Sequence, residues 1–447
     1  MKTPVRAFIL VSLITIGGYA ALAQQGAPAR PATARPAATA ARPAGDASPE
    51  SVGISTERLG RLHRGMQDIV ARREAAGIVT LVGRDGKIVD VHASGFQDVE
   101  SKTAMRTDTI FRIASMSKPV TSVAIMMLYE EGKLSLTDPV SRFIPAFKQH
   151  RVIGQDGAAT ENARRGMTIR DLLTHRSGLS YGFLNAGSVG NAYRQNGVVD
   201  GLTTTDMTLA EGIDKLAAQP LMSQPGAAWN YSLSTDVLGR VVEVASKQAF
   251  DVFLRERIFT PLGMTDTGFV VPEAKWSRFA TVYSPDGAGG IRPMKDPESF
   301  ANTHMSPIAY YKAPKKYLSG GAGLTSTARD YARFALMLAG GGAVDGVRLL
   351  SPKSVQLMAA NHTTDLTTPG LLLGPGIGFG LGFSVVTNVA ATQMLGSEGQ
   401  FGWSGIYGTN FWVDPKEKLI AIVMVQKYPG STVAGAFQPL VYQALTR

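Results

Sequence analysis

The sequence contains no cysteine among its 447 residues. This absence excludes disulfide bonds, thiol catalysis and cysteine-ligated metals, although it leaves the cellular compartment open. The six histidines show no H-x-x-x-H spacing, and no glycine-rich phosphate-binding loop occurs. The sequence therefore predicts an activity that uses neither a metal nor another cofactor.

Acidic residues are fewer than basic ones, but the resulting excess of positive charge does not indicate a nucleic-acid partner. The net charge is +10, and five positive charges lie in residues 1–45, which contain no acidic residue. The remainder of the chain thus carries half of the excess, and no basic run with interleaved aromatic residues occurs. With 44% hydrophobic residues, the chain is instead typical of a large globular protein.

The first 23 residues have the parts of a secretory signal peptide: a basic start, an apolar stretch over residues 7–20 and the small-residue site Ala21-Leu22-Ala23. Residues 24–49 are rich in alanine, proline and arginine, which predicts a disordered linker. We expect a periplasmic or secreted protein with no membrane span after cleavage. The alternative is an uncleaved signal that anchors the chain, because the apolar run is marginal for a span. The oligomeric state is not indicated.

Residues 50–447 have strand patterns at both ends and helical patterns between them. Residues 78–82 and 88–92 flank a turn signal and predict a hairpin, and Ser55 is placed to cap a preceding helix. Further helices are expected over 115–131, 168–174, 235–250, 326–338 and 434–445, and strands over 409–413 and 419–426. The predicted fold is α+β: one antiparallel sheet from both chain ends, flanked by helices, with a mostly helical subdomain over about 115–318.

Ser115-Met116-Ser117-Lys118 combines a nucleophile with its own proton acceptor. Residues i and i+3 share a helix face, so the lysine amine is expected to reach the serine hydroxyl. A hydroxyl is a weak nucleophile until a neighbouring base takes its proton. An S-x-x-K spacing alone is close to chance frequency in a chain of this length, so the interpretation depends on the surrounding segments.

The segment from Phe111 to Thr121 resembles the active-site region of the serine β-lactamase and penicillin-binding-protein superfamily. It is most similar to class C β-lactamases and family VIII carboxylesterases. Supporting segments are residues 172–179, the pair Pro225-Gly226, and residues 320–327. The resemblance covers roughly residues 50 to 445. It implies a β-lactamase-like fold and acyl-enzyme chemistry on Ser115 with Lys118.

Tyr231-Ser232-Leu233 corresponds to the second motif of the superfamily, Tyr-x-Asn in class C β-lactamases and D-Ala-D-Ala peptidases. The resemblance makes Tyr231 a proton shuttle to the leaving group, and it leaves open whether Lys118 or Tyr231 is the base during acylation. Leucine cannot hydrogen-bond a substrate amide as asparagine does, so Leu233 disfavours lactam and peptide substrates. Tyr-Ser-Leu is similar to the family VIII pattern.

Trp403-Ser404-Gly405-Ile406 is the candidate for the third motif, which is Lys-Thr-Gly in β-lactamases. Trp403 would replace the lysine that binds a substrate carboxylate, and Gly405 permits close backbone approach. The resemblance implies an oxyanion hole formed by the N–H groups of Ser115 and Ile406. Trp403, Ser404, Gly405 and Leu233 are accordingly the expected substrate-binding residues.

Two other features are interpreted as structural. His175 lies at a helix end, and a serine–lysine–tyrosine device requires no histidine. Residues 178–182 satisfy the G-x-S-x-G pattern around Ser180, but a nucleophile elbow must follow a β-strand, and here a short helix precedes it.

The sequence thus predicts an exported serine hydrolase that cleaves small carboxylic esters. The alternatives are a β-lactamase, a D-Ala-D-Ala carboxypeptidase or a transacylase with the same nucleophile, with a β-lactam as a second substrate class. An alternative of another kind is a non-catalytic cell-wall-binding homologue. Residues 182–208, rich in Gly, Asn and Thr, are a hypothetical lid over the site.

Overall fold

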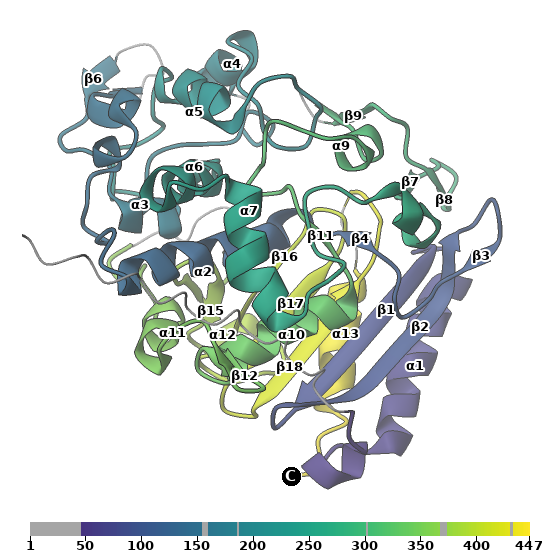
Figure 1. Ribbon diagram of the computed structural model, residues 1–447. Helices are drawn as coiled ribbons and strands as arrows, with labels where there is room; N and C mark the ends of the chain where they lie inside the picture. The colour runs from purple at the N-terminus through teal and green to yellow at the C-terminus, as the bar shows by residue number, and fades with distance from the viewer. Residues whose placement is uncertain (1–45, 154–159, 186, 301–302, 367–372, 430–431) are drawn as a thin grey trace, which may run out of the picture. The chain divides into compact units, whose positions relative to one another are not determined.

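Strands from both ends of the chain form one antiparallel sheet, as the sequence predicts. The computed structural model describes residues 46–153, 160–185, 187–300, 303–366, 373–429 and 432–447, which belong to a single compact unit. The eight-stranded sheet has the order β14-β15-β16-β17-β18-β1-β2-β3 (Figure 1). Its strands are β14 (Ile377–Phe379), β15 (Ser384–Val386), β16 (Phe401–Ser404), β17 (Asn410–Asp414), β18 (Leu419–Met424), β1 (Gly77–Arg84), β2 (Lys87–Asp98) and β3 (Thr103–Ala104).

Helices cover both faces of this sheet. On one face, α1 (Thr56–Ala71) and α13 (Val433–Tyr442) pack on side chains such as Val82 and Ala421. On the other, α2 (Ser117–Glu130) and α10 (Ala328–Ala339) pack on the alternate residues, among them Leu81 and Ile422. Burial on both faces explains why β1 and β18 are buried at every position.

The middle of the chain adds a predominantly helical region around α2, within which α6 packs against α2. Every residue of α2 from Ser117 to Leu128 is buried, as expected for a helix that is surrounded by protein. The remaining helices are α3 (Ile169–Leu173), α4 (Ser188–Gln195), α5 (Leu209–Ala217), α6 (Ser234–Ser246), α7 (Phe250–Leu254), α8 (Thr260–Leu262), α9 (Ala309–Lys312), α11 (Pro352–Met358) and α12 (Val389–Thr392). Short strand pairs complete the fold, including β4 (Phe111–Arg112) with β11 (Thr325–Ser326).

Most predicted elements are confirmed. The Ser55 hydroxyl accepts the N–H of Arg58 at the start of α1, and Asp85 and Gly86 adopt the positive φ angles of a tight hairpin turn. Two boundaries were wrong. Ser115 lies in a 3-10 turn, Ala114–Met116, and α2 begins only at Ser117, because the chain turns sharply after β4 before the helix can start.

The second wrong boundary is the helix expected to run to residue 250. It ends at Ser246 because Lys247 adopts a left-handed conformation, and α7 begins as a separate helix at Phe250. The predicted signal peptide, residues 1–23, and most of the predicted linker lie outside the described residues. Among the residues that are described, none of the helices has the length and apolar character needed to cross a membrane.

Arg84, at the end of β1, connects the segment before α1 with the turn before β18 through hydrogen bonds. Its guanidinium donates to the carbonyls of Val52 and Gly53 before α1, at 3.1 and 3.0 Å. It also donates to the backbone and the carboxylate of Glu417 before β18, both at 3.0 Å.

We expect Arg84→Ala to lower the free energy of unfolding by about 2–3 kcal/mol, since buried acceptors bonded to a charged donor lose their partner. Urea unfolding followed by circular dichroism measures this. Arg61→Ala is the control: Arg61 pairs with Glu57 on the exposed surface of α1, so its loss is expected to change stability by less than about 0.5 kcal/mol. Equal effects of the two substitutions would contradict the role given to Arg84.

Candidate active site

Ser115 lies where the short β4–β11 pair meets the start of α2. The backbone there is fixed from two sides, because the Ser117 hydroxyl accepts the N–H of Leu324 at 3.1 Å and the Tyr331 hydroxyl donates to the carbonyl of Met116 at 2.8 Å. Ser115 itself is only partly buried. A reactive hydroxyl in this position is held by a rigid scaffold while remaining open to a pocket.

The amine of Lys118 is almost completely buried, with 1% of the residue exposed. It donates three hydrogen bonds: to Ser115 Oγ at 3.3 Å, to the hydroxyl of Tyr181 at 3.0 Å and to the carbonyl of Gly321 at 2.9 Å. An ammonium group has three donors, so each one has an acceptor. The predicted serine–lysine contact is therefore present in the structure, and Tyr181 is an additional partner.

Sequence reasoning missed Tyr181. It is 2% exposed, and burial, followed by the nearby Tyr231 and Asp236, raises the pKa of its phenol well above the usual value. The phenol therefore stays neutral and accepts a hydrogen bond from Lys118. Tyr181 lies inside the G-x-S-x-G pattern, directly after Ser180. That pattern could have indicated the tyrosine, but only its serine was considered as a candidate.

Tyr231, in the loop before α6, also lies next to Lys118. The indole N–H of Trp403 donates to its hydroxyl at 3.2 Å, and Lys118 Nζ lies 4.5 Å from the centre of its ring. Tyr231 thus meets the lysine through its ring face, whereas Tyr181 meets it through its hydroxyl. The structure brings together Ser115, Lys118, Tyr231 and Trp403 as the sequence predicts.

The predicted third motif runs along β16 and into the turn that follows it. A Cβ atom on Gly405 would lie 2.4 Å from the carbonyl oxygen of Ile113, so only glycine allows this close approach. The contact brings the backbone at Ile406 beside the turn that carries Ser115. Ser115, Ser404, Gly405 and Ile406 all line one pocket.

That pocket has a volume of about 240 Å³. Its lining is mainly aromatic and aliphatic: Ser115, Tyr181, Phe183, Leu184, Asp200, Leu202, Tyr231, Ala322, Trp403, Ser404, Gly405 and Ile406. Leu184 and Leu202 come from the stretch interpreted as a hypothetical lid. Leu233, in contrast, is fully buried at the start of α6 within the main core and is not among the lining residues.

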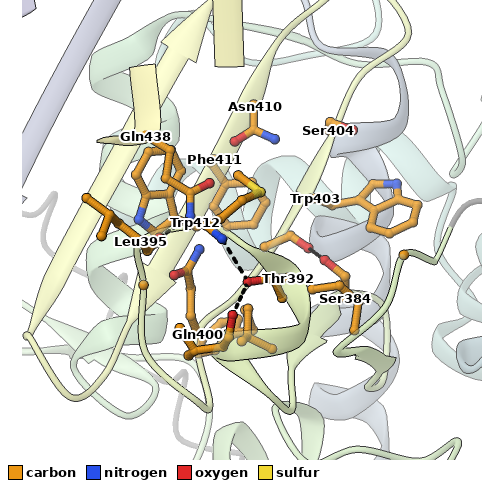
Figure 2. A pocket seen from close by; sticks show the side chains of 18 residues that line it. Ser384, Thr392, Leu395, Gln400, Trp403, Ser404, Asn410, Phe411, Trp412 and Gln438 are labelled. Atoms are coloured by element: carbon orange, nitrogen blue, oxygen red, sulfur yellow. Dashed lines mark hydrogen bonds between the residues drawn. The ribbon is translucent and has the colours of Figure 1, made fainter. Parts of the chain in front are cut away.

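A larger pocket of about 370 Å³ lies beside it and shares Trp403 and Ser404. Figure 2 shows these two residues on one side of it and Leu395 and Gln438 on the other, where the Gln438 amide donates to the Leu395 carbonyl at 2.6 Å. Neither Ser115 nor Tyr231 lines this pocket. It is therefore a neighbour of the candidate site and not the site of its reactive groups.

His175 and Ser180 are buried close to the site but do not line its pocket. His175 is fully buried next to Tyr231, with 4.8 Å between the ring centres, and its Nδ1 lies 3.2 Å from Ser232 Oγ. Burial, with a smaller effect of Lys118, lowers its pKa well below the usual value, so the imidazole is neutral. The Ser180 hydroxyl donates to the carbonyl of Tyr181 at 3.3 Å and is buried, and the element directly before it is the helix α3 and not a strand.

A buried carboxyl group, Asp236 on α6, completes the surroundings of the lysine. Burial raises its pKa to about 6, although the Ser319 hydroxyl and the Lys118 charge act in the opposite direction. Gly321 lies between these groups: a Cβ atom there would be 2.6 Å from an Asp236 oxygen, 3.0 Å from the Tyr181 hydroxyl and 3.3 Å from Lys118 Nζ. The Asp236 carboxyl, the Tyr181 hydroxyl and the Lys118 amine therefore all pack against the backbone of Gly321, where a larger residue would not fit.

Comparison with known proteins places this site in a family. The sequence model of the family described as Beta-lactamase matches residues 62–441. A Mycobacterium tuberculosis protein described as uncharacterised is 40% identical over 81% of this chain and 88% of its own. Esterase EstB of Burkholderia gladioli is 34% identical over 79% of this chain and 86% of its own. The structure of EstCE1, described as a hydrolase with promiscuous acyltransferase activity, matches with a TM-score of 0.75 at 29% identity, covering 86% of this chain and 98% of that one.

The chain therefore belongs to the β-lactamase family, and it is a hydrolase of the serine type that this superfamily contains. The predicted resemblance to the superfamily and to its esterases is confirmed, as is the α+β fold.

Gly321→Ala tests whether the close packing around Lys118 matters for hydrolysis. The added methyl group must displace an Asp236 oxygen, the Tyr181 hydroxyl or the lysine amine. Because a displacement of about 1 Å can cost roughly 100-fold in rate, we expect a loss of that size in kcat/KM for 4-nitrophenyl acetate. Gly435→Ala is the matched control, since a Cβ atom there meets no other atom within 4 Å. Full activity of Gly321→Ala would show that the arrangement tolerates disturbance.

Proposed function

We propose that this protein is an exported carboxylesterase that forms an acyl-enzyme on Ser115. The observation that carries the proposal is the hydrogen-bonded chain from Ser115 through Lys118 to Tyr181, which opens into an apolar pocket. The 34% identity to a protein described as Esterase EstB supports an ester substrate. Export rests on the signal-peptide pattern of residues 1–23.

In the proposed reaction, Lys118 acts as the neutral amine, formed when the ammonium described above gives up a proton to water. Its lone pair accepts the proton of Ser115 while Ser115 Oγ bonds to the carbonyl carbon of the ester. Lys118 is assigned as the base because it is the group hydrogen-bonded to Ser115 Oγ. Tyr231, oriented by Trp403, then gives a proton to the leaving alcohol as the carbon–oxygen bond of the ester breaks. In the second half of the reaction, water attacks the acyl-enzyme and gives a proton to the Tyr231 phenolate, while Lys118 returns its proton to Ser115 Oγ as the acid leaves, so that all three groups are restored.

The N–H groups of Ser115 and Ile406 are the proposed donors to the developing oxyanion. The close contact between Gly405 and Ile113 supports this assignment, because it fixes the two backbones relative to each other. Preorganised donors of this kind lower the barrier because they need no rearrangement as the charge develops.

Two features support an ester over a β-lactam or a D-Ala-D-Ala peptide as the preferred substrate. Those substrates carry a carboxylate, and among the described residues that line the pocket none is a lysine or an arginine. The position of the family's third-motif lysine is taken by Trp403, whose ring packs against Tyr231 with 5.5 Å between the ring centres.

Acyl transfer to an alcohol other than water is the second candidate function. It uses the same acyl-enzyme, and the name of EstCE1 records promiscuous acyltransferase activity for that relative. The apolar pocket favours it in one respect, because an apolar alcohol is bound there more readily than water. A non-catalytic, cell-wall-binding role has less support, because the nucleophile, the amine and both phenols lie in contact.

Covalent labelling tests the proposed nucleophile. We expect a fluorophosphonate to add to Ser115, as located by mass spectrometry, and a fluorescent penicillin to label it weakly or not at all. Ser115→Ala is expected to lower ester turnover by at least about 1,000-fold. Ser180→Ala is the control, because its hydroxyl is buried away from the pocket. Label on Ser180, or equal activity of both variants, would contradict the assignment.

Trp403→Lys tests what sets the preference for esters. A cation restored at this position is expected to raise the ratio of kcat/KM for a carboxylate-bearing lactam to that for a neutral ester at least about tenfold, since it provides a partner for the carboxylate. Trp403→Leu separates loss of the ring from gain of charge and should leave the ratio within about threefold of the wild type. An unchanged ratio in the lysine variant would mean that the missing cation does not determine specificity.

A further inference from the structure

The pocket that contains Ser115 also holds one acidic side chain, Asp200. It lies in the loop between α4 and α5, lines the pocket, and is only 7% exposed. The lining residues nearest to it in the sequence, Phe183, Leu184 and Leu202, are apolar. The proposed reaction does not use this carboxyl group, and no motif predicted it.

The carboxylate of Asp200 accepts fewer hydrogen bonds than its two oxygens can. Its Oδ1 accepts the N–H of Leu202 at 3.1 Å, and its Oδ2 accepts the hydroxyl of Thr303 on β10 (Thr303–Met305) at 3.3 Å. A carboxylate offers about four acceptor positions. Among the described residues, no lysine, arginine or histidine nitrogen forms an ion pair with it. The ammonium of Lys118 is already committed to three other acceptors.

A buried carboxylate without a cationic partner is costly, because it has lost its water shell. Burial raises the pKa of Asp200 to about 6, so the group is largely ionised above that pH and neutral below it. Aromatic faces lie around the same pocket, and rings of Phe and Trp attract cations when water is excluded. Lys118 lies against the ring face of Tyr231, and the ring of Trp403 lines the same cavity.

We propose that Asp200 is a specificity-determining residue that selects esters carrying an ammonium group and disfavours esters and lactams carrying a carboxylate. This inference rests on the proposed esterase function and names its substrate class. The cation supplies the partner that the carboxylate lacks, and the apolar walls contact the methylene or methyl groups beside it. A substrate anion in the same pocket meets a negative charge at close range.

Other ionisable groups surround Asp200 and must be separated from its effect. Asp236 on α6 interacts electrostatically with Asp200, as do Tyr181, Tyr310, Tyr317 and Tyr407. Asp206 lies on the same loop, His304 follows the partner Thr303 on β10, and Lys118 on α2 lies near Asp236. A comparison of two esters that react at the same serine removes their influence on the chemical step. The quantity to measure is therefore a ratio of kcat/KM values for two substrates.

The substrates are acetylcholine and 3,3-dimethylbutyl acetate, which differ only in the replacement of the charged nitrogen by carbon. At pH 8 we expect the ratio of kcat/KM, cationic over neutral, to fall at least about tenfold in Asp200→Asn, mainly through KM. Asp206→Asn, an equal change of charge at an exposed position of the same loop, is expected to keep the wild-type ratio. An unchanged ratio in Asp200→Asn overturns the inference.

A measurement on the wild-type enzyme avoids dependence on a buried substitution. Because Asp200 ionises near pH 6, the ratio is expected to rise between pH 5 and pH 7 and to stay level from pH 7 to pH 8. A ratio that is flat with pH overturns the role of Asp200 even when both esters are cleaved. If the wild-type enzyme cleaves neither ester nor any short aryl ester, the proposed function itself fails, and the inference falls with it.

Discussion

The buried amine of Lys118 is the constraint on which the rest of the site depends. An ammonium group taken out of water costs several kcal/mol unless the protein replaces its hydration. Here three hydrogen-bond acceptors, the ring face of Tyr231 and the nearby carboxyl of Asp236 perform that replacement. Apart from Ser115, these groups come from segments distant from Lys118 in the sequence, at Tyr181, at residues 231–236 and at Gly321. The fold must therefore be complete before the lysine is stable in its place.

Glycines make this arrangement sterically possible. Gly321 leaves room for an Asp236 oxygen and the Tyr181 hydroxyl beside Lys118, and Gly405 lets β16 approach the turn at Ile113. Gly320 is similarly enclosed, because a Cβ atom there would lie 2.6 Å from the carbonyl of Thr235. The glycine-rich segment that carried part of the sequence resemblance is thus explained by packing: backbone fills the space that side chains would otherwise block.

The sequence predicted those parts of the structure that follow from local rules or from motifs. The helix cap at Ser55, the hairpin at Asp85-Gly86 and the contact between Ser115 and Lys118 are all determined by neighbours within a few residues. Tyr181 and Asp236 could not be placed in this way. They come from separate elements, and only the tertiary packing brings them to Lys118. Leu233 shows the opposite case: its motif position is recognisable, but the side chain packs into the core.

The charged groups in and around the pocket disfavour an anionic substrate. Asp200 and Asp236 are both buried, and burial raises the pKa of each to about 6, so at neutral pH two carboxyl groups lie near a single ammonium. Trp403, predicted from the sequence to take the third-motif lysine position, lines the pocket and adds no charge. A substrate carboxylate therefore meets apolar walls and a negative charge in this pocket, whose described lining contains no lysine or arginine. The preference proposed for neutral or cationic esters follows from this charge distribution as a whole, and not from the loss of one lysine.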